Sequence, residues 1–263
     1  MDCFRHGCVL FAGDAAHGVS PFGARGANSG VQDAENLAWK LALVVQGKAP
    51  EALLASYAAE REYAADENIR NSTRATDFIT PKSEVSRLFR DAVLELAKEH
   101  AFARTLVNSG RLSVPATLHD SPLNTPDADA FEGCMVPGAV AADAPVRRAD
   151  GTPGWLLREL GDGFTALVYG DDDAAFAKEL GAAAAGLAPL AVLRIVAPGV
   201  EADAGTGVAA GTLVDTEGLV ARRYDLRPGT VYLLRPDQHV CARWRQPSAE
   251  QMKAALGRAL ATA

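Results

Sequence analysis

Two short stretches near the start of the chain combine residue types that can bind a ligand. Asp14 follows an apolar run at residues 9–12, which is typical of a buried strand, and small residues beside it allow close backbone approach. Residues 26–30 (Gly-Ala-Asn-Ser-Gly) then lead into a helical pattern. Because the first N–H groups of a helix have no partner within the helix, they attract negative charge. The sequence therefore predicts a ligand site built from a strand, a glycine-rich loop and a helix N-terminus.

The helix behind this loop is predicted over residues 28–46. Leu37, Leu41 and Val44 recur at helical spacing, which gives the helix an apolar face. Asp33 and Glu35 lie near its start, where the helix dipole favours acidic side chains. We expect the apolar face to pack inside the protein while the N-terminus meets the ligand.

Residues 13–40 as a whole resemble the second flavin-binding motif of FAD-dependent aromatic-ring monooxygenases, the family of phenol hydroxylase and para-hydroxybenzoate hydroxylase. The resemblance implies that a carboxylate accepts a hydrogen bond from a ribityl hydroxyl of FAD. It also implies that the helix N-terminus stabilises negative charge on the N1–C2=O edge of the isoalloxazine, and that a proline lies beside the flavin ring near the substrate. The cofactor-binding residues that it assigns are Asp14, Pro21, Gly26, Ala27 and Asn28, and it leaves the role of His17 open.

Two other motifs of that family are absent from the 263 residues. The Gly-x-Gly-x-x-Gly sequence, which holds the FAD pyrophosphate, has only a string of different spacing at residues 205–211. The Asp-Gly motif shared by FAD and NAD(P)H is absent too. We therefore expect the C-terminal portion of an enzyme that hydroxylates a small aromatic substrate with FAD, NAD(P)H and O2. By itself the chain is expected to bind FAD weakly or not at all and to be catalytically incomplete. The alternative is a non-catalytic accessory or dimerisation module derived from that enzyme.

Composition excludes several other classes of function. The net charge of −7 and the lack of a basic patch argue against nucleic-acid binding, and no apolar run approaches the roughly 20 residues of a membrane span. The four cysteines show no paired spacing, so reduced thiols in a cytoplasm are expected. Cys3, His6, Cys8 and His17 fit no common zinc spacing, and no metal site is predicted. Apolar surface left uncovered on residues 9–12 and 28–46 is expected to seek either a second copy of the chain or the missing N-terminal half.

The middle of the chain is predicted to be helical and then irregular. Residues 51–76 carry helix formers, and Ser83 is a plausible N-cap for the helix that follows. We expect Arg61 and Glu62 to lie on a solvated face. Six prolines punctuate residues 110–153, which predicts a connection with little regular structure. The expected domains are 1–110, a remnant of the FAD-binding domain, and 154–263, with residues 111–153 as a linker.

Residues 154–263 alternate between strand and helix patterns. After a short helix at 155–160 their order is β-α-β-α-β-β-α, with strands at 164–169, 190–196, 230–234 and 240–244, and helices at 173–185, 218–224 and after Ser248. Residues 223–240 resemble the C-terminal thioredoxin-like domain of the phenol hydroxylase branch. The fold class is thus α/β, a partial FAD-binding domain followed by a thioredoxin-like domain. That domain lacks a Cys-x-x-Cys, and Cys241 lies inside a strand, so we expect a buried thiol without redox function. Asp237 and His239 are explained by turn formation at the hairpin tip.

Overall fold

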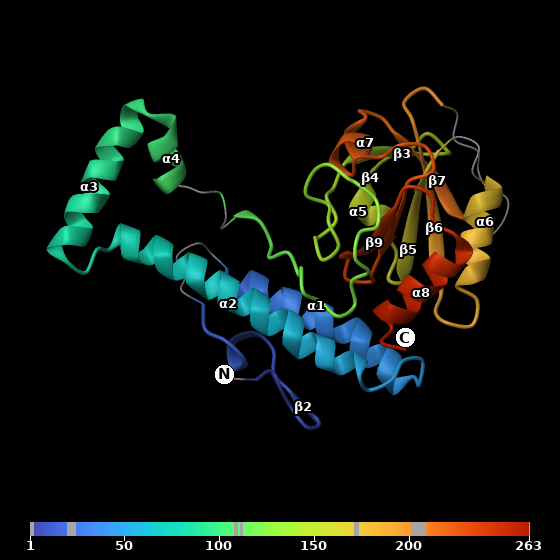
Figure 1. Cartoon of the computed structure of the whole chain (residues 1–263), viewed down its shortest axis with the longest axis horizontal. Helices are drawn as coiled ribbons and strands as arrows, with labels where there is room; N and C mark the ends of the chain where they lie inside the picture. Colours follow the sequence, from blue (N-terminus) through green and yellow to red (C-terminus); the bar gives the residue numbers. More distant parts are fainter. Residues whose placement is uncertain are drawn as a thin grey trace. The chain divides into compact units, whose positions relative to one another are not determined.

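The computed structural model describes residues 3–19, 25–107, 110, 113–170, 174–200 and 209–262. The chain divides into two compact units, each of which draws on two separate stretches of sequence (Figure 1). The first unit comprises Met1–Ala38 and Tyr57–Ala116, and the second comprises Trp39–Ser56 and Thr117–Ala263. Two long helices, α1 (Gly26–Val45) and α2 (Leu53–Ile79), therefore contribute residues to both units.

The first unit begins with a short hairpin followed by a single helical turn. The two strands, β1 (Arg5–His6) and β2 (Val9–Leu10), pair antiparallel, and η1 (Gly13–Ala15) follows them. The sequence prediction of a buried strand over residues 9–12 is wrong in both length and burial, since only two residues pair and Val9 is 54% exposed. The reason is that, among the described residues, β2 pairs with β1 alone in a two-stranded sheet.

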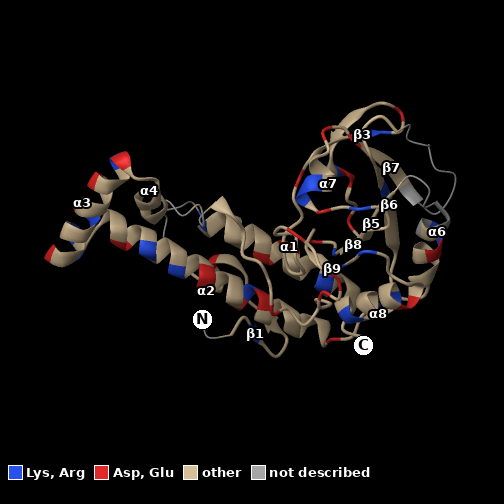
Figure 2. Ribbon diagram, turned by 45° about the horizontal axis from the view of Figure 1, so that its top comes forward, with Lys and Arg blue, Asp and Glu red and all other residues tan. Residues whose placement is uncertain are grey.

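Two further helices complete the first unit. They are α3 (Glu84–Glu99) and α4 (Ala101–Val107). The predicted cap of α3 is confirmed, because the Ser83 hydroxyl accepts a hydrogen bond from the Ser86 N–H at 3.1 Å. Charged residues of both signs lie along α2 and α3 (Figure 2). None of the helices in the described part of the chain is long and apolar enough to cross a membrane.

The second unit is built on a mixed sheet with the strand order β4-β3-β7-β6-β5-β8-β9 (Figure 1). Strand β5 pairs parallel with β6, and β6 pairs parallel with β7, while the remaining pairs are antiparallel. The strand bounds are β3 Pro145–Arg148, β4 Pro153–Trp155, β5 Phe164–Tyr169, β6 Leu190–Val196, β7 Ala209–Asp215, β8 Val231–Leu234 and β9 Val240–Trp244.

Helices cover both faces of this sheet. One apolar cluster joins alternate residues of β5 and β8 to α6 (Ala174–Ala183) and α8 (Ala249–Ala259). The residues between them, such as Leu167 and Tyr232, enter a second cluster with α5 (Leu156–Glu159) and α7 (Leu219–Arg223). This alternation follows from the two-residue period of a strand. The predicted cap of α8 is confirmed as a capping box between Ser248 and Gln251.

The sequence prediction for the second unit missed three strands. Strands β5, β6, β8 and β9 lie where the sequence placed them, but β3, β4 and β7 were not predicted. Residues 113–153 also bond to the sheet. The Thr125 N–H donates to the Cys241 carbonyl and the Gly138 N–H to the Val240 carbonyl, both at 2.7 Å. Gly138 must be glycine, since its φ is +91° and a Cβ would lie 2.3 Å from the Leu118 carbonyl oxygen.

Candidate functional site

The structure places the predicted ligand-binding residues in two neighbouring elements of the first unit. Asp14 lies in η1 with its side chain exposed to solvent. Gly26 is the first residue of α1, and both Ala27 and Asn28 in its first turn are exposed. Pro21 lies outside the described residues. A carboxylate and a helix N-terminus are thus both accessible to a ligand.

A glycine pair brings these two elements together. A Cβ added to Gly30 would lie only 3.3 Å from the Cα of Gly13, so η1 and the second turn of α1 touch through backbone atoms. Gly13 also has a φ of +59°, a conformation that residues with a side chain rarely adopt. The small residues of the motif therefore serve close packing between the Asp14 turn and α1.

The buried carboxylate of Asp33 ties the same turn to α1 and α2. Its Oδ2 accepts the Gly13 N–H at 2.9 Å and His17 Nε2 at 2.7 Å. Its Oδ1 accepts Arg61 Nε at 2.7 Å, and Asp33 is fully buried. Such charge-assisted bonds are stronger than neutral ones, and they satisfy a carboxylate that would otherwise be costly to bury.

This environment shifts two pKa values. Burial alone would raise the pKa of Asp33, but the hydrogen bond from His17 and the charge of Arg61 together hold it below its ordinary value. Asp33 is therefore an anion at neutral pH. Burial, and secondarily the charge of Asp33, raise the pKa of Tyr57 to about 12, so its hydroxyl stays protonated and donates to the Phe11 carbonyl at 2.5 Å.

The prediction that Arg61 and Glu62 lie on a solvated face is wrong. Arg61 is 3% exposed, and Glu62 accepts the Phe4 N–H at 2.7 Å. A signal was present in the sequence, because Arg61 lies four residues after Tyr57 on the side of α2 that also buries Asn68 and Ser72. A charged residue at an inward position of a helix implies a buried partner, and here that partner is Asp33.

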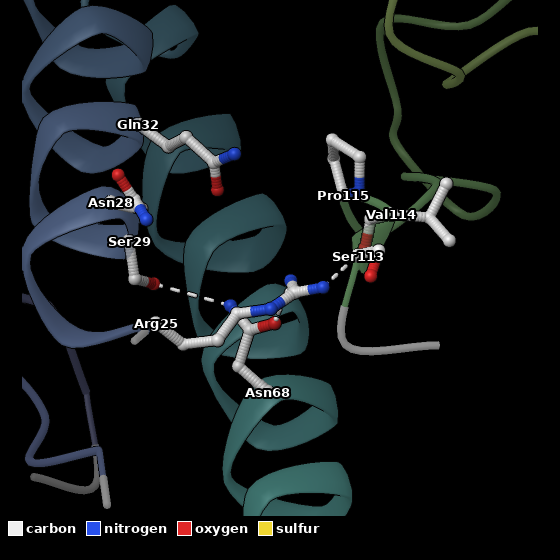
Figure 3. A pocket seen from close by; sticks show the side chains of 8 residues that line it. All are labelled: Arg25, Asn28, Ser29, Gln32, Asn68, Ser113, Val114 and Pro115. Atoms are coloured by element: carbon white, nitrogen blue, oxygen red, sulfur yellow. Dashed lines mark hydrogen bonds between the residues drawn. The ribbon is translucent and has the colours of Figure 1, made fainter. Parts of the chain in front are cut away.

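A polar pocket adjoins the start of α1 (Figure 3). Its volume is about 200 Å³, and it is lined by Arg25, Asn28, Ser29, Gln32, Asn68, Ser113, Val114 and Pro115. The guanidinium of Arg25 donates to Asn68 Oδ1 at 2.8 Å and to the Val114 carbonyl at 2.7 Å. The lining is rich in amides and hydroxyls and carries one cation, which suits a polar or anionic group of a ligand.

The second unit holds the candidate redox and polar residues of the hairpin. Cys241 is fully buried, as the sequence predicted. Asp237 is more than a turn residue, since it forms a buried ion pair of 2.6 Å with Arg235. His239 Nδ1 lies 2.9 Å from the Asp237 carbonyl oxygen, a contact within the turn. Burial alone would raise the pKa of Asp237, but the charge of Arg235 holds it well below its ordinary value. Within the described residues, no group of three or more His, Cys, Asp or Glu side chains could hold a metal ion.

Comparison with known proteins shows which proteins resemble this chain. The profile of the FAD binding domain family matches residues 1–72. The 4-methyl-5-nitrocatechol 5-monooxygenase of a Burkholderia species is 34% identical over 276 residues, which cover 98% of this chain and 44% of that protein. Over almost all of its length the chain is thus similar to FAD-dependent aromatic monooxygenases and hydroxylases. It spans less than half the length of the curated relatives that it matches over almost all of its own length.

Solved structures of this family share the fold. Aklavinone-11 hydroxylase in a ternary complex with FAD and aklavinone is 25% identical, with a TM-score of 0.68 over 98% of this chain and 44% of that one. The flavin-dependent monooxygenase PieE, in complex with FAD and substrate, is 22% identical with a TM-score of 0.72, over 99% of this chain and 49% of that one. Both units of the chain therefore have counterparts in flavin monooxygenases.

Proposed function

We propose that this chain supplies the C-terminal portion of a flavin-dependent monooxygenase that hydroxylates a small aromatic substrate with NAD(P)H and O2. The observation that carries the proposal is the packing of the Asp14 turn against α1 through Gly13 and Gly30, with Asp33 bonded to both ends of that turn. Asp14 offers an acceptor for the hydroxyl groups of a ligand, and the N-terminus of α1 offers N–H donors for a negatively polarised edge. The two groups lie on neighbouring elements.

The residues present fit FAD. The exposed carboxylate of Asp14 suits a ribityl hydroxyl. The first N–H groups of α1, a helix of 20 residues, have no acceptor within the helix itself and suit the pyrimidine edge of the flavin. Gly26 and Ala27 leave that edge room to approach the backbone. Bound FAD would supply the oxygen-activating chemistry, while this chain would orient the cofactor and stabilise its charge.

Titration of the 263-residue chain with FAD, followed by flavin fluorescence, tests the proposal. Three or four hydrogen bonds contribute about 0.5–3 kcal/mol each, and ordering a flexible dinucleotide costs several kcal/mol. We therefore expect saturable binding with a dissociation constant on the order of micromolar to millimolar, and no hydroxylation by this chain alone.

Two variants sharpen this titration. Asp14→Ala should weaken FAD binding about tenfold, the equivalent of one charge-assisted bond. Asp66→Ala removes an exposed carboxylate on α2 and should leave the affinity unchanged. Equal FAD affinities of the wild-type chain and Asp14→Ala, or no saturable binding at all, would contradict the proposal.

We also infer a thioredoxin-like arrangement for residues 154–263. It is supported by the parallel β5–α6–β6 unit, by the antiparallel β8–β9 hairpin beside β5, and by α8 after it. Strand β7 and the β3–β4 pair extend the sheet on the side of β6. In this proposal residues 154–263 form a rigid domain without redox function.

A second candidate function, a dimerisation module derived from such an enzyme, is favoured by one observation. Val85, Leu88 and Phe89 of α3 are 60–78% exposed, and Phe102 and Leu106 of α4 are 59–63% exposed. Exposed apolar patches of this kind mark association sites. A colourless protein that sediments as a dimer, and becomes monomeric in Leu88→Ser/Phe89→Ser, would favour this function, whereas a clean monomer at micromolar concentration would exclude it.

A further inference from the structure

We propose that His17 is a positioning residue for the flavin site. Through its hydrogen bond to Asp33 it holds the Asp14 turn closed beside the start of α1. The inference rests on the proposed function where it concerns flavin, but its structural part can be tested without any ligand.

The geometry of one carboxylate oxygen carries the proposal. Gly13 precedes Asp14 directly and His17 follows it by three residues, and both donate to the same atom, Asp33 Oδ2, at 2.9 and 2.7 Å. That oxygen therefore clamps both ends of the turn that presents Asp14. The backbone reinforces the closure, since the N–H groups of Ala16 and His17 donate to the Gly13 carbonyl at 2.9 and 3.1 Å.

Asp33 and His17 are themselves held in place by buried contacts with other residues of the first unit. Asp33 is held from its other oxygen by Arg61 of α2, and the His17 ring stacks on Phe4 with centroids 5.5 Å apart. His17 is 7% exposed. Because ring and carboxylate are both buried and packed, Asp14 is the one member of this turn whose charge is free to face solvent or a ligand.

Only one ring nitrogen of His17 bonds to Asp33. Nε2 bonds Asp33, whereas Nδ1 is buried without a hydrogen-bond partner among the described residues. Since Asp33 is an anion and an acceptor, Nε2 carries the proton that is donated. A glutamine amide reaches the position of Nε2 and an asparagine amide reaches that of Nδ1. His17→Gln should therefore restore the clamp, and His17→Asn, of similar polarity, should not.

Loss of the hydrogen bond between His17 and Asp33 should lower the affinity for FAD, because the turn would no longer be ordered before binding. An open turn must be closed again when a ligand binds, and that ordering is subtracted from the binding free energy. We expect His17→Asn to weaken FAD binding about fivefold to tenfold, within the range of one net hydrogen bond. His17→Gln should remain within about twofold of the wild type. In an Asp14→Ala background, His17→Asn should add almost nothing, because both changes remove the same contact.

Hydrogen exchange of the free protein tests the positioning directly. Amides of residues 13–17 should exchange faster in His17→Asn than in the wild type, while His17→Gln should match the wild type. This readout holds even if the wild-type chain binds no flavin, an outcome that would count against the proposed function alone. Equal exchange in all three proteins would overturn the clamp. Additive effects of His17→Asn and Asp14→Ala on flavin affinity, or a Gln variant as impaired as the Asn variant, would overturn it as well.

Discussion

In the second unit the sheet buries apolar side chains on both faces, whereas the first unit buries charged and amide side chains between α1 and α2. Around Asp33 and Arg61 lie the buried pairs Asn36–Glu60 and Arg25–Asn68, at 2.7 and 2.8 Å. Among the described residues, the apolar cluster of the first unit contains four buried members, Phe4, Ala16, Tyr57 and Ala65. Each unit thus excludes water, but by different means.

We interpret the second unit as a scaffold and the first unit as the part that holds the proposed ligand site. Burying an ion pair gains little net stability over an apolar core of the same volume, because desolvation offsets the attraction between the charges. The polar interior of the first unit has another consequence, since its directed bonds hold one turn and one helix N-terminus in a defined relation. The second unit also buries the Arg235–Asp237 ion pair, but its two large clusters are apolar, and apolar contacts contribute stability without directed bonds.

The strongest way to break the first unit is to remove its central acceptor. Asp33→Ala leaves the Arg61 guanidinium buried without an anion and deprives two further donors of a partner. We expect the free energy of unfolding of this unit to fall by about 3–5 kcal/mol. All three tryptophans, Trp39, Trp155 and Trp244, belong to the second unit.

In a denaturant titration tryptophan fluorescence therefore reports the second unit, while helical circular dichroism reports both units. In Asp33→Ala part of the helical circular dichroism should be lost at lower denaturant than in the wild type, while tryptophan fluorescence should keep its midpoint. Asp66→Ala, which removes an exposed carboxylate, is the matched control. Equal shifts of both signals would show that the two units unfold together.

The second unit should respond to the loss of apolar volume instead. Leu233 on β8 is fully buried, and Leu233→Ala should cost about 2–5 kcal/mol, seen as an earlier tryptophan transition. The exposed Leu88 on α3 provides the control, for which about 0.5 kcal/mol or less is expected. Flavin affinity should not change in Leu233→Ala. A matching loss of affinity would contradict the separation of scaffold from site.

Acid should weaken both units, with a smaller effect. The folded pKa values of Asp33 and Asp237 both lie below the unfolded value of about 4, so each contributes stability above that pH and loses it as the pH falls through its folded value. The denaturant midpoints of both circular dichroism and tryptophan fluorescence should therefore fall as the pH is lowered below about 4. Midpoints that do not change with pH in this range would be inconsistent with these two pairs.

The smallest effect is expected at the buried thiol. Cys241→Ala should cost about 1 kcal/mol, the ordinary price of a small core change, and should leave flavin affinity intact. The wild-type chain should not catalyse the reduction of insulin by dithiothreitol, because Cys241 is fully buried in β9 and has no second cysteine beside it in sequence. Turnover that disappears in Cys241→Ser would show a redox role.

Local features of this protein could be read from the sequence. Strands β5 and β6 have their predicted bounds, because each is a mostly apolar run followed within two residues by a glycine or a proline. The caps at Ser83 and Ser248 depend on atoms only three residues apart. The positions of Asp14 and Gly26 next to a turn and at a helix start also follow from nearby residues, although their contacts with a flavin stay a prediction.

Tertiary structure decided the features that join distant residues. Strand β3 exists because β7, over 60 residues further along the chain, pairs with it. The short run Pro-Val-Arg-Arg shows no alternation of apolar and polar residues that would predict a strand. Asp33 was interpreted as a dipole contact and Arg61 as a solvated residue, yet the two meet across 28 positions. A local pattern reports which face of a helix is apolar, but which polar groups are buried together depends on how the helices pack. That packing gave Gly13, His17 and Arg61 a common acceptor.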